Sequence, residues 1–149
     1  MQIDRNGLEV LGRSVCLRLL AGATVGRLAI TSGALPSVLP VTFRLVGDSI
    51  IIRTGRGTKL DAATRNAVVA FETDEIDAPT QSGWSVVVTG MTREVDQPDE
   101  IEALRGQVVP WWLPADHGRF VAISTELVSG RRLHPRPLDM TRAGHAEPS

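Results

Sequence analysis

Residues 37–66 read SVLPVTFRLVGDSIIIRTGRGTKLDAATRN, and the character of the sequence changes twice along this stretch. Two runs rich in Val, Ile, Thr and Phe, residues 37–46 and 48–54, meet at turn residues around Gly47. β-Branched and aromatic residues favour strands, whereas glycine next to aspartate favours a turn. Residues 42–46 also show the two-residue alternation of a strand whose two faces differ. The stretch therefore predicts two strands, followed by a basic loop and a helix.

Four further runs of the same composition extend this pattern along the chain. They cover residues 25–32, 67–76, 84–95 and 120–133. About six strands at this spacing predict an all-β barrel or sandwich, and the lack of a βαβ rhythm predicts a mainly antiparallel sheet. We expect one mainly β domain over residues 1–133 and a frayed tail over residues 134–149, which has little apolar content.

A few short helices are expected at the periphery of the strands. They are predicted over residues 15–22, 58–66 and 97–106. Ser14 is the expected N-cap of the first helix. Asp96 or Gln97 is expected near the cap of the last one, with Pro98 in its first turn.

Composition limits the possible functions of the chain. It has 149 residues, a formal net charge of −1 and one cysteine. A nearly neutral chain is not expected to bind nucleic acid through bulk charge, and one cysteine makes neither a disulfide nor a zinc motif. Neither a signal-like run nor a membrane-spanning run is present, so we expect a cytoplasmic protein without a membrane partner.

The basic loop after the second strand is the main candidate site. Three cations, two hydroxyls and two glycines fall within seven positions: Arg53, Thr54, Gly55, Arg56, Gly57, Thr58 and Lys59. Converging cations, hydroxyls and glycine N–H groups at a helix start can bind an anion, and a solvated basic turn has the same composition. The glycine spacing matches neither a Walker A loop nor a dinucleotide-binding fingerprint.

Other features are open to two interpretations. Pro40 interrupts an apolar strand, which indicates either an edge strand or a functional break. Trp84 at the start of a strand is typical of a core residue as well as of a ligand contact, whereas Trp111 and Trp112 suggest a lid or a partner surface. Arg131 and Arg132 should point to opposite faces if their strand persists. The spacing shows no nucleophile with a base and no metal site.

Taken in order, these segments resemble the pyridoxamine 5′-phosphate oxidase-like FMN-binding split-barrel family, particularly its short actinobacterial-type members. The resemblance covers about residues 7–133. It rests on residues 7–30, 35–63, 67–77, 82–90 and 128–133. It implies a six-stranded antiparallel split β-barrel that forms a homodimer, with two flavin sites at the dimer interface and a small-molecule substrate.

The resemblance also assigns roles to individual residues. Lys59 matches the family's phosphate-binding lysine, and Thr58 stands where larger oxidases often have arginine. Arg53 and Thr54 match strand-end contacts to the phosphate and ribityl groups. The strand along the isoalloxazine ring corresponds to Pro40, Val41, Thr42 and Phe43. Trp84 and Ser85 occupy the place where the family contributes a polar residue to the flavin. Arg131 or Arg132 corresponds to a further flavin contact from the C-terminal strand, made in the same subunit or across the dimer.

These matches lead to an FMN-dependent oxidoreductase of unknown substrate as the main hypothesis, in which no side chain need act as acid or base. Relatives of this size also use deazaflavins or bind haem, and the loop alone does not separate these cofactors. Because no substrate grip is recognisable, a non-enzymatic carrier or sensor for flavin, deazaflavin or haem is the alternative. A haem would make His117 the first candidate ligand. The C-terminal residues after Gly130 do not match the substrate-phosphate grip of true oxidases, so pyridoxal phosphate synthesis is not expected.

Overall fold

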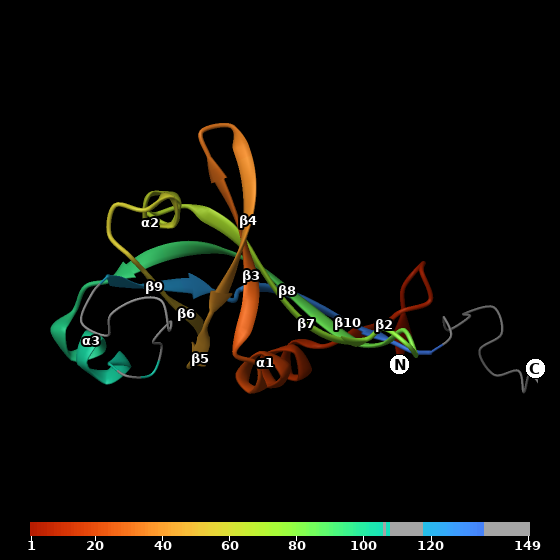
Figure 1. The fold of residues 1–149 in the computed structure, drawn as a ribbon. Coiled ribbons are helices and arrows are strands. Elements are labelled where there is room, and N and C mark those ends of the chain that lie inside the picture. The colour runs from red at the N-terminus through yellow and green to blue at the C-terminus, as the bar shows by residue number, and fades with distance from the viewer. Residues whose placement is uncertain (106, 108–117, 136–149) are drawn as a thin grey trace, which may run out of the picture.

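The computed structural model describes residues 1–105, 107 and 118–135. Ten strands are found in this part of the chain: β1 (Gln2–Ile3), β2 (Glu9–Leu11), β3 (Val25–Ser32), β4 (Leu35–Thr42), β5 (Arg44–Val46), β6 (Ser49–Thr54), β7 (Val68–Asp77), β8 (Ser82–Val95), β9 (Arg119–Ser124) and β10 (Leu127–Leu133). The helices are α1 (Arg13–Gly22), α2 (Lys59–Ala63) and α3 (Pro98–Leu104). They lie outside the strands (Figure 1). The mainly β class is therefore confirmed.

The strands form an antiparallel ring. Hydrogen-bonded neighbours run in the order β4–β3–β7–β8–β9–β6–β5. β4 and β5 are separated in sequence only by Phe43, so they act as two halves of one barrel strand. Counted this way, the six predicted strands form the six-stranded barrel.

β8 is the strand at which the barrel splits. One edge of β8 pairs with β7, whereas the other pairs first with β10 and then, from Thr92 onward, with β9. β9 and β10 were expected as a single strand, but the strand is interrupted between Ser124 and Leu127. Before the interruption β9 pairs with β6 and β8, and after it β10 pairs with β8 and β2. At this crossing a Cβ on Gly90 would overlap the carbonyl oxygen of Ser124, so only glycine allows the close approach.

The strand predicted over residues 37–46 is likewise broken, at Phe43. Its N–H donates to Thr24 O at 3.0 Å, and its ring packs edge-to-face on Phe71 with the ring centroids 4.7 Å apart. Turning this one aromatic side chain into the core bends the strand and links the two halves β4 and β5.

The prediction that Ser14 caps the first helix is wrong. The helix begins at Arg13 with Gly12 as N-cap and without a side-chain cap. The guanidinium of Arg13 instead donates to Thr125 O at 2.5 Å, so a tertiary contact holds this end of the helix. Gln97, one of the two residues expected near the cap of the last helix, is the N-cap of α3, and Thr58 is the N-cap of α2.

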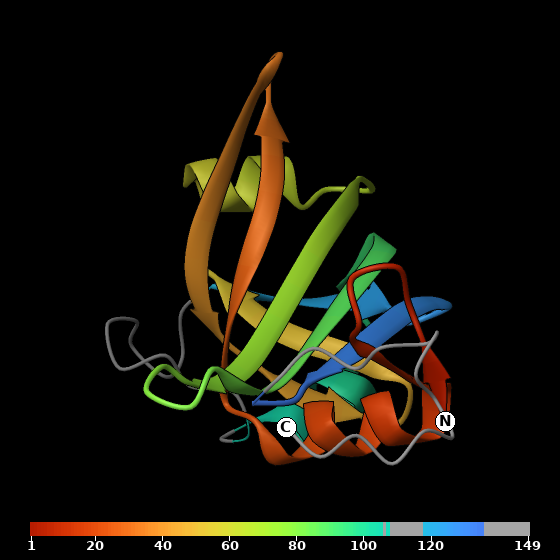
Figure 2. The ribbon, with the colours of Figure 1, turned by 90° about the vertical axis from the view of Figure 1, so that its right-hand side faces the viewer.

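Two clusters of buried side chains form the core. The larger one lies between α1 and the barrel and includes Cys16, Leu20, Phe43 and Phe71. Figure 2 shows α1 running across one end of the strands, while the β3–β4 hairpin projects at the opposite end. Among the described helices, none has the length and apolar content needed to cross a membrane.

Candidate functional site

The basic loop folds around the carboxylate of Asp61, and its residues 55–58 join β6 to α2. The N–H of Gly57 donates to Asp61 Oδ2 at 2.9 Å, and the hydroxyl of Thr54 donates to Oδ1 at 3.3 Å. The N–H of Asp61 donates in return to Thr58 Oγ1 at 3.0 Å. Thr58 also donates its hydroxyl proton to Gly55 O at 2.8 Å. Side-chain to backbone hydrogen bonds of this kind fix a turn in one conformation.

Asp61 forms a buried ion pair with Arg119, the first residue of β9. Arg119 Nε contacts Asp61 Oδ1, and Nη2 donates to Asp61 O at 2.6 Å and to Thr64 Oγ1 at 3.0 Å. The side chains of Arg119 and Asp61 are only 2% and 6% exposed. Arg65 adds a half-exposed partner at 3.1 Å, and Glu94 Oε1 lies 3.6 Å from Arg119 Nε. The pair thus anchors the loop to the barrel.

The surroundings of Asp61 favour its charged form. Burial by itself opposes ionisation, but the hydrogen bonds from Arg119, from Gly57 N–H and from Arg65 outweigh it and hold the pKa of Asp61 well below its usual range. The carboxylate is therefore a structural anion at neutral pH.

A cavity of about 440 Å³ opens between this loop and the edge strand β4. Its lining consists of Leu39, Pro40, Arg53, Thr54, Gly55, Thr58 and Leu60, and we call it the loop cavity. Four predicted site residues are among them. The volume falls in the range of about 300–1,000 Å³ that is typical of small-molecule sites.

Lys59 is not part of the lining of the loop cavity, although its sequence neighbours Thr58 and Leu60 are. Its Nζ donates to Ser37 Oγ of β4 at 2.8 Å, and an ammonium group has three donors, so two are available to a ligand. The hydroxyl protons of Thr54 and Thr58 are already donated within the loop. Because α2 spans only five residues, attraction for an anion comes mainly from the cations Arg53 and Lys59.

The predicted ring-facing strand residues lie in different environments. Pro40 is exposed on β4, which pairs with β3 alone among the described strands. Val41 and Phe43 point into the core and are 4% and 5% exposed. Thr42 Oγ1 is buried and makes no hydrogen bond to the described residues. Any ligand along this edge would therefore meet backbone groups and Pro40, not the side chains of Val41 or Phe43.

A second group of predicted residues lies at the far end of the sheet, away from α2 and the loop (Figure 1). In the β8–β10 register, Ser85 is opposite Arg131 and Trp84 is opposite Arg132. Residues directly opposite share a face, so Ser85 and Arg131 lie on one face of the sheet, and Trp84 and Arg132 on the other. Trp84 packs on the core. A single chain does not bring these four residues to the loop cavity.

Both arginines of this second group already have acidic partners. Arg131 Nε donates to Asp4 Oδ2 at 2.9 Å, and Arg132 Nε lies 3.8 Å from Glu9 Oε1. The prediction that the two arginines point to opposite faces is confirmed by the persistence of β10 to Leu133.

Asp61 and Arg119 were not identified from the sequence as parts of the site. Asp61 had a local signal, because a Thr followed three residues later by an acid marks a helix start. Arg119 had none, since it is 58 positions away from Asp61 in the sequence. His117, Trp111 and Trp112 lie outside the described residues.

Comparisons with known proteins agree with the fold. The family model described as "Pyridoxamine 5'-phosphate oxidase" matches residues 12–132. The uncharacterized protein Rv0080 of Mycobacterium tuberculosis is 38% identical over 128 residues, which cover 83% of this chain and 84% of that protein.

Two solved structures are also similar. The FAD binding protein of Mycobacterium smegmatis is 30% identical with a TM-score of 0.70, covering 84% of this chain and 97% of that one. A FAD-binding protein of Mesorhizobium loti is 25% identical with a TM-score of 0.72, covering 84% of this chain and 97% of that one. A family match over most of the barrel means that this chain belongs to the pyridoxamine 5′-phosphate oxidase family.

Proposed function

We propose that the chain is a flavin-dependent oxidoreductase that binds the riboflavin phosphate half of its cofactor in the loop cavity. The observation that carries the proposal is a cavity of suitable size beside the edge strand β4, lined by Arg53, Thr54 and Thr58, with Lys59 between the lining residues Thr58 and Leu60 in the sequence. FMN is the flavin predicted from the sequence. FAD contains the same half, so the loop cavity alone serves either form.

The residues present fit such a group. Arg53 lines the cavity, and Lys59 provides two further N–H donors for a phosphate, while Gly55 leaves the backbone accessible. The edge of β4 from Pro40 to Thr42 offers backbone groups to a planar ring. When bound, a flavin supplies the hydride or electron transfer, and the protein orients it and tunes its surroundings.

Relatives support the flavin assignment. The Mycobacterium smegmatis and Mesorhizobium loti proteins, at 30% and 25% identity, are described as FAD binding, and each similarity covers 84% of this chain. Reduction of the bound flavin by a nicotinamide cofactor, followed by its reoxidation with an added acceptor, would separate an enzyme from a carrier.

Flavin titration of the Lys59→Ala variant tests the phosphate end of the site. One charge-assisted hydrogen bond contributes roughly 1.5–3 kcal/mol, so FMN affinity should fall by about tenfold or more. Arg18→Ala, which removes an exposed cation from α1, is the matched control and should bind FMN normally. Equal affinities in the two variants would refute the phosphate assignment.

Lys59 also permits a direct readout, because it is the only lysine in the sequence. An amine-reactive reagent modifies this residue and the chain terminus, and the two products are distinguishable by mass spectrometry of peptides. FMN should slow the modification of Lys59 and leave the terminus unaffected. Unchanged modification in the presence of saturating FMN would place the phosphate elsewhere.

We further propose that the working form is a homodimer. The outer face of β4–β3–β7–β8–β10 exposes a row of apolar side chains: Val25, Val38, Val68, Val87, Met91 and Leu127. A row of exposed apolar side chains along one face of a sheet is typical of an interaction face. Ser85 and Arg131 lie on the same face, so a second copy seated there could bring them to a loop cavity of its partner.

The Val87→Asp variant tests this proposal. A charge in the middle of a dimer interface should convert the dimer to a monomer and weaken flavin binding, since the site then loses its second half. Molar mass by light scattering reports the first effect and flavin titration the second. A wild-type chain that is monomeric at all concentrations, yet binds flavin, would contradict the dimer.

A further inference from the structure

The carboxylate of Asp61 closes the basic loop into a ring. The register of β6 and β9 places Thr54 opposite Arg119 where the chain leaves β6, and both side chains donate to the same oxygen, Asp61 Oδ1. The other oxygen, Oδ2, accepts from the N–H of Gly57 at 2.9 Å. Asp61 itself belongs to α2, which follows the loop. One side chain therefore ties together the beginning, the middle and the end of residues 54–61, and joins them to β9.

The turn at Gly57 depends on this side chain. Gly57 is exposed, its φ of +78° lies in the left-handed region, and an added Cβ would meet no atom within 4 Å. Packing therefore does not hold the turn, and a glycine in such a place is free to adopt other conformations. Among the described residues, Asp61 is the partner that fixes the N–H of Gly57.

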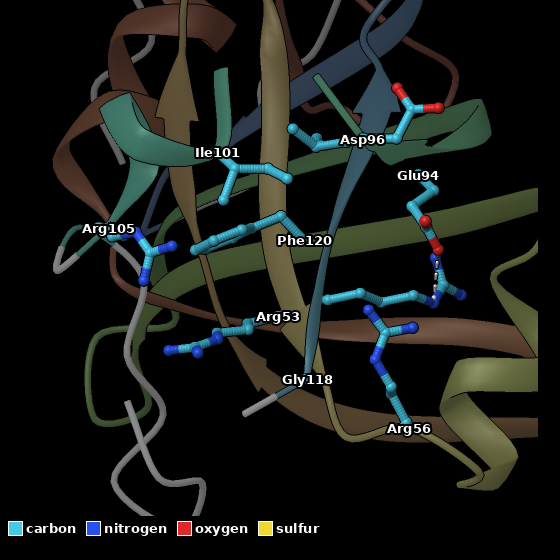
Figure 3. Close-up of a pocket in the computed structure, with 10 residues that line it drawn as sticks. Arg53, Arg56, Glu94, Asp96, Ile101, Arg105, Gly118 and Phe120 are labelled. Carbon is cyan, nitrogen blue, oxygen red and sulfur yellow. Dashed lines mark ion pairs between the residues drawn. The ribbon is translucent and has the colours of Figure 1, made fainter. Parts of the chain in front are cut away.

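Asp61 does not itself face a ligand. Its side chain is 6% exposed, and it lines neither the loop cavity nor a second cavity of about 360 Å³ between α3, β6 and β9. Figure 3 shows this second cavity, where an ion pair turns Glu94 toward Arg119. Thr54 and Thr58 do line the loop cavity, and Asp61 bonds to both, to Thr58 through its N–H at 3.0 Å. Asp61 can therefore act on a ligand only through the residues that it holds.

We propose that Asp61 is a positioning residue for the flavin phosphate: its carboxylate holds the basic loop in the binding conformation before the cofactor arrives. The inference rests on the proposed function, because it takes the phosphate of the flavin to bind at this loop. A flexible loop would have to be ordered by the ligand, and the lost conformational entropy would reduce the affinity. A loop closed on Asp61 is ordered on folding instead.

Riboflavin separates the two ends of the cofactor, since it has the ring and the ribityl chain of FMN but no phosphate. The other end of the loop cavity, at Leu39 and Pro40, belongs to β4, which is held by its pairing with β3 and not by Asp61. A positioning role therefore predicts a loss of affinity for FMN alone. A merely structural role of Asp61 would weaken the binding of FMN and of riboflavin alike.

The experiment measures the Kd of FMN and of riboflavin by flavin-fluorescence titration in the wild type and in Asp61→Asn. Asparagine keeps the size of the side chain, but its single oxygen cannot accept from both Gly57 and Arg119 at the two places that the carboxylate oxygens occupy. Asp61→Leu with Arg119→Met removes the same carboxylate without leaving a buried charge alone, and it serves if Asp61→Asn does not fold.

Two control variants separate positioning from stability and from surface charge. Gly90→Ala strains the β8–β9 crossing at Ser124 and leaves the hydrogen bonds of the loop in place. Arg65→Ala removes the half-exposed partner of Asp61 but leaves Arg119 and Gly57 bonded to the carboxylate. Both controls should keep the wild-type ratio of the two dissociation constants.

The wild type should bind FMN at least about tenfold more tightly than riboflavin, as one charge-assisted hydrogen bond to a phosphate predicts. In the Asp61 variant this preference should fall by about tenfold, while the Kd of riboflavin stays close to its wild-type value. A folded Asp61 variant with an unchanged preference would overturn the inference, and the proposed function would still stand if Lys59→Ala loses the preference. Equal weakening of both flavins would also overturn it. A wild type that binds the two flavins equally, or neither of them, would refute the phosphate assignment and the inference together.

Discussion

The buried pair of Asp61 and Arg119 is the feature whose loss should cost the protein most stability outside the apolar core. Asp61→Ala removes the acceptor for Arg119 Nε, for the N–H of Gly57 and for the hydroxyl of Thr54. Arg119 would then remain 2% exposed with its charge unmatched, apart from Glu94 at 3.6 Å. Breaking a buried pair by removing one partner typically costs about 3–5 kcal/mol, and we expect a loss in this range.

Denaturant unfolding followed by tryptophan fluorescence measures this loss, with Arg65→Ala as the internal comparison. Arg65 also contacts Asp61 at 3.1 Å, but its side chain is 50% exposed, so its removal should cost roughly 0–1 kcal/mol. Replacing both members, Asp61→Leu with Arg119→Met, should recover much of the stability, because no buried charge is then left alone. A loss below about 1 kcal/mol in Asp61→Ala, or equal losses in Asp61→Ala and Arg65→Ala, would refute the reasoning.

The pH dependence of this contribution has a definite sign. The pKa of Asp61 is lower in the folded protein than in the unfolded chain, so the folded state binds fewer protons in acid. The stabilisation is fully present above the ordinary aspartate pKa and is lost as pH falls toward the lowered value. Wild-type stability should therefore decline in this acidic window more steeply than that of Asp61→Ala.

Two further predictions concern the sheet. Burial and then the neighbouring Asp74 raise the pKa of Glu72 to about 7, so the folded state holds its proton longer and stability should fall as pH rises from 4.5 toward 7. Glu72→Gln should flatten this part of the melting-temperature profile, and an unchanged slope would contradict the assignment. Gly90→Ala should cost about 1–3 kcal/mol in denaturant unfolding, because the added Cβ overlaps Ser124 O at the β8–β9 crossing. An unchanged free energy of unfolding in Gly90→Ala would mean that β8 and β9 can move apart at this crossing, against the reasoning.

The fold was predictable because each barrel strand has a recognisable composition in its own short stretch of sequence. Short Val- and Ile-rich runs with turn residues between them locate the barrel strands without knowledge of their neighbours. The breaks at Phe43 and after Ser124 were not predictable in this way, since both depend on contacts made elsewhere in the fold. Phe43 turns toward Phe71, and the chain after Ser124 changes its position along the edge of β8.

The candidate site was predictable in part for the same reason. The cations Arg53, Arg56 and Lys59 fall within seven consecutive positions, and the structure places Arg53 in the lining of the loop cavity. The pairing of Asp61 with Arg119 was not predictable, because a contact between residues 58 positions apart produces no pattern in the local sequence. The expected contribution of Arg131 to the site stays a prediction, because a single chain does not bring this residue to the loop cavity.

The buried pair also explains how a loop with so many cations can be ordered before any anion binds. Cations that repel one another in a flexible turn would disorder it, but Asp61 holds the loop through the N–H of Gly57 and neutral hydroxyl groups. The guanidinium of Arg119, not those of Arg53 or Arg56, compensates the charge of this carboxylate most closely. Lys59 reaches β4 through the neutral Ser37 and so keeps its full charge. The charge of Asp61 is thus compensated within the barrel, so the conformation of the loop does not depend on a bound anion.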